Sequence, residues 1–254
     1  MAGILEGKVG IVTGAGSGIG RETALAMARE GAKIVVSDVV DEHGADTVAM
    51  IEATGGSAAF VHADVSKEAD TAAMVRFAVD TFGTLDLAVN NAGIGGPAAL
   101  TGDYPVDGWE KVIGINLSGV FLSLRAELGV MAAAGAGSIV NISSILGFVG
   151  YPYSCAYVAA KHGVIGLTQN AALEYAAQGV RVNSVHPGFI DTPLVTSSGI
   201  ERGDDTWNAI AAKHAMGRWG TTHEVAEVVL WLLSDKASFV TGSQYVVDGG
   251  YLAQ

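Results

Sequence analysis

Apolar and polar positions along the chain follow two alternating spacings, one typical of buried strands and one typical of helices. Short continuous apolar runs rich in Val and Ile, such as 8–13 and 33–37, are typical of strands buried on both faces of a parallel sheet. Each run is followed by a longer segment with apolar residues at helical spacing. The pattern predicts strands at 8–13, 33–37, 58–62, 85–90, 138–143, 181–185 and 244–247, and helices at 18–30, 42–53, 67–82, 108–134, 154–177 and 223–234.

The strict alternation of strands and helices predicts right-handed βαβ units, and therefore an α/β fold with one doubly wound parallel sheet. The pattern covers 1–254 with no linker and no repeat of solenoid period, so we expect a single domain. The longest irregular stretch lies at about 188–221. Because long loops in compact domains often cover a binding site, we expect a substrate lid there.

Composition excludes several classes of function. The chain has 26 acidic and 14 basic residues and a formal net charge of −12, which disfavours nucleic acid and anionic membrane surfaces as partners. It has one cysteine, and its six histidines include no i, i+4 pair, so we expect no disulfide and no metal site. No signal peptide is apparent and no uninterrupted apolar run reaches about 18 residues, so we expect a soluble, cytoplasmic protein.

A glycine-rich turn, TGAGSGIG at 13–20, joins the first predicted strand to the first helix. Gly14, Gly18 and Gly20 have the spacing G-x-x-x-G-x-G. Positions without side chains let the backbone approach a pyrophosphate, whose charge is met by amide N–H groups and the helix N-terminus. Such a turn also occurs for purely structural reasons. Here it opens a βαβ unit of the right length, which favours a nucleotide site.

Asp38, at the end of the second predicted strand, indicates which dinucleotide binds. It follows Gly20 by 18 positions, near the distance at which an acidic residue meets the adenosine ribose. A carboxylate there accepts hydrogen bonds from both ribose hydroxyls and repels a 2′-phosphate. Its neighbours Val39 and Val40 and the turn residue Ser17 supply no cation for such a phosphate. The alternative is a solvated acid at a strand end; we expect NAD.

With these motifs and several others, the chain resembles the short-chain dehydrogenase/reductase family over essentially its whole length. The further matching residues are Asp64-Val65, Asn90-Asn91-Ala92-Gly93, Asn116, Ser143-Ser144, Tyr157-Val158-Ala159-Ala160-Lys161 and Pro187-Gly188-Phe189-Ile190-Asp191-Thr192. The resemblance implies a Rossmann fold, a nicotinamide cofactor, and oxidation of an alcohol or reduction of a carbonyl. It also implies a cofactor site made by Gly14, Ser17, Gly18, Ile19, Gly20, Asp38, Asp64, Val65, Asn91, Tyr157, Lys161, Pro187, Gly188, Ile190 and Thr192.

The residue types at 157 and 161 account for proton transfer. Tyr157 and Lys161 are four positions apart on a predicted helix, so both side chains project from one face. An unperturbed tyrosine has a pKa of about 10, which is too high for a base at neutral pH. A neighbouring ammonium and the positive nicotinamide of the oxidised cofactor favour the phenolate and lower that pKa. We therefore expect Tyr157 to take the alcohol proton while hydride leaves for the nicotinamide.

Two further polar residues complete the expected catalytic group. Ser144 precedes Tyr157 by 13 residues, the spacing at which the family places its catalytic serine, and a hydroxyl there can hydrogen-bond the reacting oxygen. Its neighbour Ser143 is the alternative. Period-two alternation lets only one of the two face the site, and we favour Ser144. By resemblance, Asn116 holds a water in a proton relay behind the lysine, a role compatible with tying a helix to the sheet.

The expected substrate is an apolar secondary alcohol or ketone. Apolar residues lie in the lid and after Ser144, and Lys161 is the one Lys or Arg between Arg125 and Arg181. A 3-oxoacyl-carrier reductase is the alternative, but it must dock an acidic carrier protein through basic residues. Two other classes remain: a non-redox isomerase that uses bound NAD as a transient oxidant, and a cofactor-sensing module, which would have little need for the catalytic group. The apolar residues concerned are Ile145, Leu146, Phe148, Tyr151, Tyr153, Leu194, Val195, Ile200, Trp207, Ile210 and Met216.

The predicted helices at 108–134 and 154–177 also suggest self-association. Both carry small and apolar residues on more than one face, whereas a helix in a monomer needs only one apolar stripe. A second stripe requires another partner, unless the alanines merely favour helix formation. We expect a homo-oligomer, and the family resemblance alone favours a homotetramer over a dimer.

Overall fold

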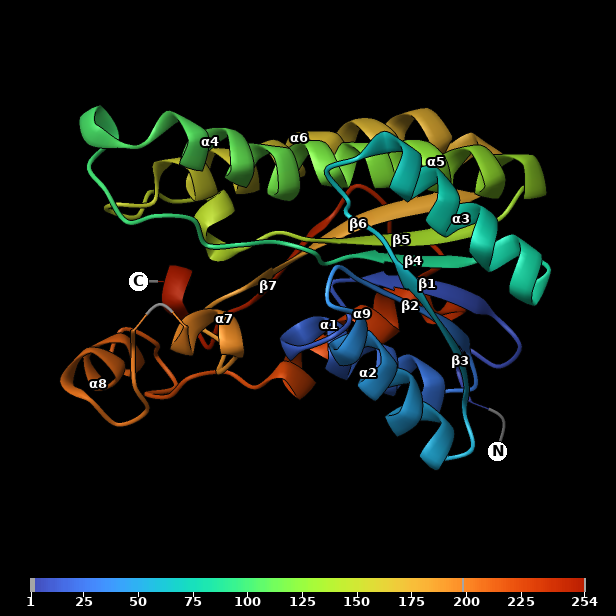
Figure 1. Cartoon of the computed structure of the whole chain (residues 1–254), viewed down its shortest axis with the longest axis horizontal. Helices are drawn as coiled ribbons and strands as arrows, with labels where there is room; N and C mark the ends of the chain where they lie inside the picture. Colours follow the sequence, from blue (N-terminus) through green and yellow to red (C-terminus); the bar gives the residue numbers. More distant parts are fainter. Residues whose placement is uncertain (1–2, 198, 254) are drawn as a thin grey trace.

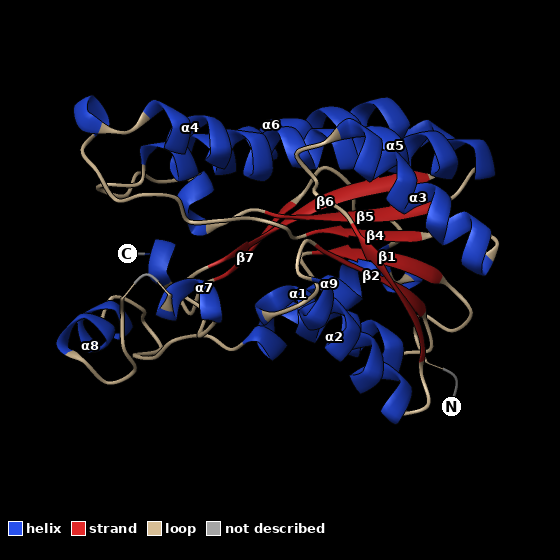
Figure 2. Cartoon of the chain, viewed as in Figure 1, coloured by secondary structure: helices blue, strands red, loops and turns tan. Residues whose placement is uncertain are grey.

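The computed structural model, in which residues 3–197 and 199–253 are described, contains one parallel sheet with helices on both faces (Figures 1 and 2). The strand order is β3-β2-β1-β4-β5-β6-β7. From β1 the chain adds strands first on one side of the sheet and then, from β4 on, on the other side, as in a doubly wound fold. This confirms the predicted fold class. The strands are β1 (Val9–Thr13), β2 (Lys33–Asp38), β3 (Ser57–His62), β4 (Leu87–Asn90), β5 (Gly137–Ile142), β6 (Val180–Pro187) and β7 (Gln244–Val247).

Helices cover the sheet in two layers, visible above and below it in Figure 1. One layer consists of α1 (Gly18–Arg29), α2 (Asp41–Ala53) and α9 (Thr222–Leu233), and the other of α3 (Glu68–Phe82), α5 (Gly119–Ala134) and α6 (Cys155–Tyr175). Successive strand residues enter opposite cores: Val12 and Val36 pack toward the first layer, whereas Ile11 and Val35 pack toward the second. The continuous apolar strands are therefore buried on both faces, as predicted.

The helix predicted at 108–134 contains an irregularity that its periodicity did not reveal. Helix α4 (Val106–Ile113) passes through a π-helical turn, Gly114–Ser118, directly into α5. The resulting helix of 29 residues, Val106–Ala134, is long and apolar enough to cross a membrane by length and composition alone, which the sequence analysis did not anticipate. It packs along the sheet beside α3 and α6, the position of a core helix (Figure 1). Its π turn carries the buried Asn116.

The segment expected to be irregular at 188–221 contains two short helices. Helix α7 (Pro193–Thr196) starts with a proline, which favours a first helical turn, and α8 (Asp205–Ala211) begins where the Asp204 carboxylate accepts the Trp207 N–H at 2.6 Å. Helices of four and seven residues are too short to show clear periodicity. A bridge between Ile190 and Gly220 closes the segment, which lies beyond the carboxyl ends of the strands (Figure 1).

Candidate active site

Two adjoining cavities, each of about 280 Å³, lie at the carboxyl ends of the strands. The first extends from the glycine-rich turn to Asp64, and the second contains Tyr157 and Lys161. Five residues line both cavities, so together they form one continuous groove. This is the place where open α/β sheets bind their ligands. The shared residues are Ile19, Asn91, Gly93, Thr192 and Leu194.

Glycines keep part of the glycine-rich turn free of side chains where it faces the first cavity. Gly14 and Gly18 have φ values of +62° and +54°, a region that favours glycine. A Cβ on Gly14 would lie 2.9 Å from the Cα of Ala92. Gly20 has a different role from the other two: a Cβ there would lie 2.3 Å from the Gly14 carbonyl oxygen, and the residue lines neither cavity. Gly20 therefore permits close packing of the turn.

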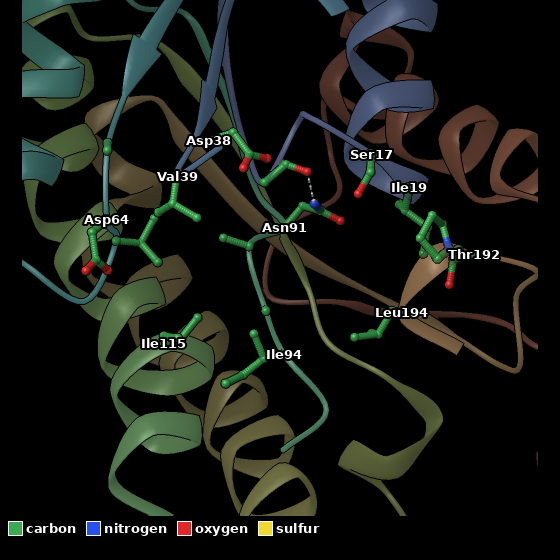
Figure 3. A pocket seen from close by; sticks show the side chains of 17 residues that line it. Ser17, Ile19, Asp38, Val39, Asp64, Asn91, Ile94, Ile115, Thr192 and Leu194 are labelled. Carbon is green, nitrogen blue, oxygen red and sulfur yellow. Dashed lines mark hydrogen bonds between the residues drawn. The ribbon is translucent and has the colours of Figure 1, made fainter. Parts of the chain in front are cut away.

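Asp38 lies at the far end of the first cavity with both carboxylate oxygens turned to the turn and the following loop (Figure 3). Its Oδ2 accepts the Gly16 N–H at 2.8 Å, and its Oδ1 accepts the Val40 N–H at 3.0 Å. Each oxygen keeps a free lone pair for a ribose hydroxyl. The described lining of this cavity contains no Lys or Arg.

The opposite walls of the first cavity come from the loops after β3 and β4. Asp64, labelled in Figure 3, lines the cavity together with its neighbour Val65. Hydrogen bonds from Ser66 hold the pKa of the Asp64 carboxyl below its usual value. The Asn91 amide donates to the carbonyl oxygens of Thr13 and Gly14 at 2.9 and 3.2 Å. Asn91 thus fixes the glycine-rich turn against the end of β4.

The residues predicted to hold the cofactor fit a dinucleotide. Apart from Gly20, every one of them lines one of the two cavities, including Pro187, Gly188, Ile190 and Thr192 in the second. The glycine-rich turn and the acceptor at Asp38 suit a pyrophosphate and a ribose, and the two adjoining cavities offer a place for each half of such a ligand.

Ser144, Tyr157 and Lys161 meet in the second cavity. Tyr157 and Lys161 are one turn apart on α6, and the Lys161 ammonium lies 5.5 Å from the centre of the Tyr157 ring. Its Nζ donates to the Ile142 carbonyl at 2.8 Å, and burial lowers the pKa of Lys161 to about 8. Ser144 hydrogen-bonds Tyr157, whereas the Ser143 hydroxyl donates to the Lys161 carbonyl at 2.9 Å.

The protonation of Tyr157 differs from the prediction in one respect. Burial raises the pKa of Tyr157, and only the hydrogen bond with Ser144 acts to lower it. The expected decrease through Lys161 is therefore not produced by the residues of the chain alone. The reason is desolvation, which disfavours the phenolate and also weakens the lysine as a cation.

Asn116 lies outside the lining of both cavities. Its amide donates to the Ile94 carbonyl at 2.8 Å, and its Oδ1 accepts the Ile94 N–H at 2.9 Å. The residue thus ties the π turn to the loop after β4, and the structure does not bring it together with the other three.

Comparison with known proteins decides the family. A family described as enoyl-(acyl carrier protein) reductase matches residues 14–252. A cyclohexanol dehydrogenase from Acinetobacter sp. (strain SE19) is 50% identical over 254 residues, covering 100% of this chain and 98% of its own. A cis-4-hydroxycyclohexanecarboxylate dehydrogenase from Sinomonas cyclohexanicum is 47% identical, covering 97% of each chain. The crystal structure of levodione reductase superposes with a TM-score of 0.95 at 39% identity, covering 98% of this chain and 99% of the other.

The chain belongs to the short-chain dehydrogenase/reductase family. It is an oxidoreductase of the alcohol dehydrogenase type, and its family implies a nicotinamide cofactor. In this dehydrogenase the part of the chain that the structure describes contains no group of three or more His, Cys, Asp or Glu able to hold a metal ion.

The substrate cavity of this dehydrogenase is mainly apolar. Of the apolar residues singled out in the sequence, six line it, whereas Tyr153 and Met216 are exposed and Ile210 on α8 is buried. Lys161 is the one Lys or Arg in the described lining. The six are Ile145, Leu146, Tyr151, Leu194, Val195 and Ile200.

An aromatic cluster joins the lid to the body of the dehydrogenase. Phe189 lies with its ring centre 5.9 Å from Tyr151, 5.5 Å from Trp219 and 5.7 Å from Tyr251. Trp219 stacks on Trp207 at 3.9 Å. Tyr251 lines neither cavity and reaches the second one only through its contact with Phe189, a relation that no local pattern in the sequence indicates.

Proposed function

We propose that this enzyme transfers a hydride between NAD(H) and an apolar secondary alcohol or ketone. The observation that carries the proposal is that Ser144, Tyr157 and Lys161 meet in an apolar cavity that opens into the dinucleotide groove. When bound, the nicotinamide supplies the hydride acceptor in oxidation and the hydride donor in reduction.

In this proposal the polar residues handle the proton and the reacting oxygen. Tyr157 Oη takes the hydroxyl proton during alcohol oxidation and returns it to the oxygen during ketone reduction. Ser144 Oγ stabilises the charge that develops on that oxygen, and its hydrogen bond with Tyr157 favours the phenolate. Lys161, fixed by the Ile142 carbonyl, places its ammonium next to the Tyr157 ring. Asn116 supports the floor of the groove through Ile94 and is the candidate for holding a relay water.

We also propose NAD rather than NADP as the cofactor. The Asp38 carboxylate stands where the adenosine ribose is expected, and the described lining around it offers no cation for a 2′-phosphate. A phosphate placed against this carboxylate would meet like charge without compensation.

A homotetramer is the assembly that we propose. Phe121 on α5 and Leu173 on α6 are 48% and 85% exposed, although both helices also pack on the sheet. Exposed apolar side chains on such helices favour burial against a second copy.

We also propose a cytoplasmic location, because the single free cysteine, Cys155, fits a reducing compartment such as the cytoplasm.

The relatives favour a substrate in which the alcohol is carried by a ring. The two relatives described above are named as dehydrogenases of cyclohexanol and of cis-4-hydroxycyclohexanecarboxylate. In the described lining of the substrate cavity Lys161 is the one Lys or Arg, and its ammonium is bonded to the Ile142 carbonyl, which supports the neutral member of this pair.

A panel of alcohols tests the proposed function. Cyclohexanol, a linear secondary alcohol, a primary alcohol and a charged hydroxy acid are each supplied with NAD, and NADH is followed at 340 nm. We expect turnover with the neutral secondary alcohols, and cyclohexanone should be reduced with NADH. Conversion of a substrate without net NADH formation would instead support the isomerase, and reduction of 3-oxoacyl thioesters alone would support the carrier-linked reductase.

A further inference from the structure

A buried histidine, His186, connects the end of β6 to Ser144. Its Nδ1 lies 3.1 Å from the Ser144 carbonyl oxygen, and its Nε2 lies 2.8 Å from the Ser184 hydroxyl. The His186 side chain has no exposed surface. A carbonyl oxygen can only accept a hydrogen bond, so Nδ1 carries the proton. In the neutral ring Nε2 is then an acceptor, and the Ser184 hydroxyl donates to it.

The surroundings keep the His186 ring neutral and fixed. Burial and the charge of Lys161 lower the pKa of His186 to about 4, although the hydrogen bond with Ser144 opposes the decrease. The Phe148 ring packs on the imidazole with its centre 4.5 Å away. A ring with both nitrogens bonded and one face covered has a single orientation, so it holds its partners at a fixed separation.

Ser144 depends on such support because it lies just beyond the end of β5. Its Oγ accepts the Leu146 N–H at 3.1 Å, and its carbonyl accepts the Gly147 N–H at 2.9 Å. These contacts come from the turn that Ser144 itself begins. Two hydrogen bonds join this backbone to β6: the Ser143 N–H donates to the Val185 carbonyl at 2.8 Å, and the His186 ring donates to the Ser144 carbonyl at 3.1 Å.

We propose that His186 is a positioning residue for the reaction, holding the Ser144 backbone so that its hydroxyl meets Tyr157 and the substrate oxygen. The inference rests on the proposed catalytic role of Ser144. His186 touches neither substrate nor cofactor and exchanges no proton. Through Pro187 and Gly188, which follow it directly and line the substrate cavity, the same residue ties the serine to the opposite wall.

Two amide variants test whether the hydrogen-bond donor at the position of Nδ1 is what matters, or only a polar side chain at residue 186. In His186→Asn the side-chain NH₂ takes the position of Nδ1, whereas in His186→Gln it takes a position near Nε2. We expect His186→Asn to retain at least half of the kcat for alcohol oxidation. His186→Gln and His186→Phe should lower kcat by about tenfold or more, since small displacements of a catalytic group are costly. The Kd for NADH, measured by fluorescence in all three, should change less than kcat does, because Ser144 does not belong to the predicted cofactor site although Pro187 and Gly188, which follow His186, do.

His162→Phe is the matched control. His162 is an exposed histidine on α6 whose Nδ1 also lies at hydrogen-bond distance, 2.9 Å, from a backbone carbonyl. It lines neither cavity, so kcat should remain within about twofold of wild type. Equal losses in His186→Asn and His186→Gln would overturn the proposal, as would full activity in His186→Gln.

A double variant shows whether His186 acts through Ser144. If it does, His186→Gln lowers kcat by about tenfold in the wild-type background but by less than about twofold in Ser144→Ala. The same fractional loss in both backgrounds would contradict the inference. Full activity of Ser144→Ala on its own would instead refute the proposed catalytic role of the serine.

The wild-type protein gives an independent check that does not depend on a variant folding. The ¹⁵N chemical shifts of His186 should show a proton on Nδ1 and none on Nε2 from pH 6 to 8. A proton on Nε2 would overturn the proposal, because that tautomer cannot donate to the Ser144 carbonyl.

Discussion

The ammonium of Lys161 lies 5.5 Å from the centre of the Tyr157 ring, one helical turn away on α6, and a carbonyl at the end of β5 fixes it there. This relationship is the basis of the proposal that the two residues act together. Burial alone raises the pKa of the tyrosine, so a proton acceptor at this position depends on nearby positive charge.

Replacing Lys161 by methionine tests this dependence, because methionine keeps much of the length and packing but carries no charge. We expect kcat for alcohol oxidation to fall by about 100-fold or more at pH 8. A loss of this size is in the range of rate enhancement that general acid–base groups usually provide. The residual rate should rise with pH up to at least pH 10, since the phenolate must then form without the cation. A Lys161→Met variant within about threefold of wild type at pH 8 would show that the charge is not required.

Asp38 should determine cofactor choice. We expect kcat/KM for NAD to exceed that for NADP by at least about tenfold, equivalent to about 1.4 kcal/mol. In Asp38→Ala the preference should shrink, because both the ribose acceptor and the repulsion of the 2′-phosphate are lost. Equal efficiency with the two cofactors in the wild type would contradict the assignment.

The lid should affect substrate binding through its stacked tryptophans. In Trp207→Ala the 3.9 Å stack on Trp219 is lost, and the Phe189 wall of the cavity loses its support. We expect KM for the alcohol to rise roughly tenfold while the Kd for NADH stays within about twofold. A tenfold change corresponds to the free energy of one aromatic pair together with the packing that is lost. Trp231→Ala is the control, because Trp231 on α9 pairs with Tyr245 on β7 and lines neither cavity. Equal effects of the two substitutions would show that the stack has no specific role.

A buried carboxyl group should make stability depend on pH. Glu127 on α5 is fully buried, and burial raises its pKa to about 7 although a hydrogen bond from Asn90 opposes the increase. Between about pH 4.5 and 7 the folded protein therefore binds a proton that the unfolded chain has released. The stabilisation that comes from this tighter proton binding is fully present below pH 4.5 and is lost as pH rises through 7. The free energy of unfolding should decrease by up to about 3 kcal/mol from this group.

Glu127→Gln isolates that effect, because the amide resembles the protonated acid at every pH. In urea unfolding, the free energy of unfolding of the variant relative to that of the wild type should increase as pH increases from 5 to 8.5. The exposed Glu174 on the neighbouring helix provides the control, and Glu174→Gln should show no such gain. A constant difference between Glu127→Gln and wild type across this range would mean that the carboxyl group titrates normally.

Local patterns predicted most of the fold, and the family resemblance added most of the candidate site residues. The strands at Val9–Thr13 and Lys33–Asp38 and the turn between them follow from short-range spacing, and so does the pairing of Tyr157 with Lys161 on one helix. What could not be predicted depends on contacts between distant segments. The raised pKa of Tyr157 comes from burial, and the partners of His186 include a carbonyl 42 residues away.

Short or irregular elements were the other source of error. The two helices of the lid have too few residues to show a period, and the π turn at Asn116 keeps the apolar spacing of a continuous helix. The packing role of Gly20 is also invisible in the sequence, since a glycine motif does not show which member approaches a ligand and which approaches the backbone.

The most direct test of the account is the kcat of Tyr157→Phe with a secondary alcohol and NAD, measured together with NADH binding. The substitution removes the phenolic oxygen and little volume. We predict that kcat falls by about 100-fold or more while the Kd for NADH stays within about threefold of wild type. A variant that keeps more than about a tenth of the wild-type kcat would contradict the assignment of Tyr157 as the proton acceptor.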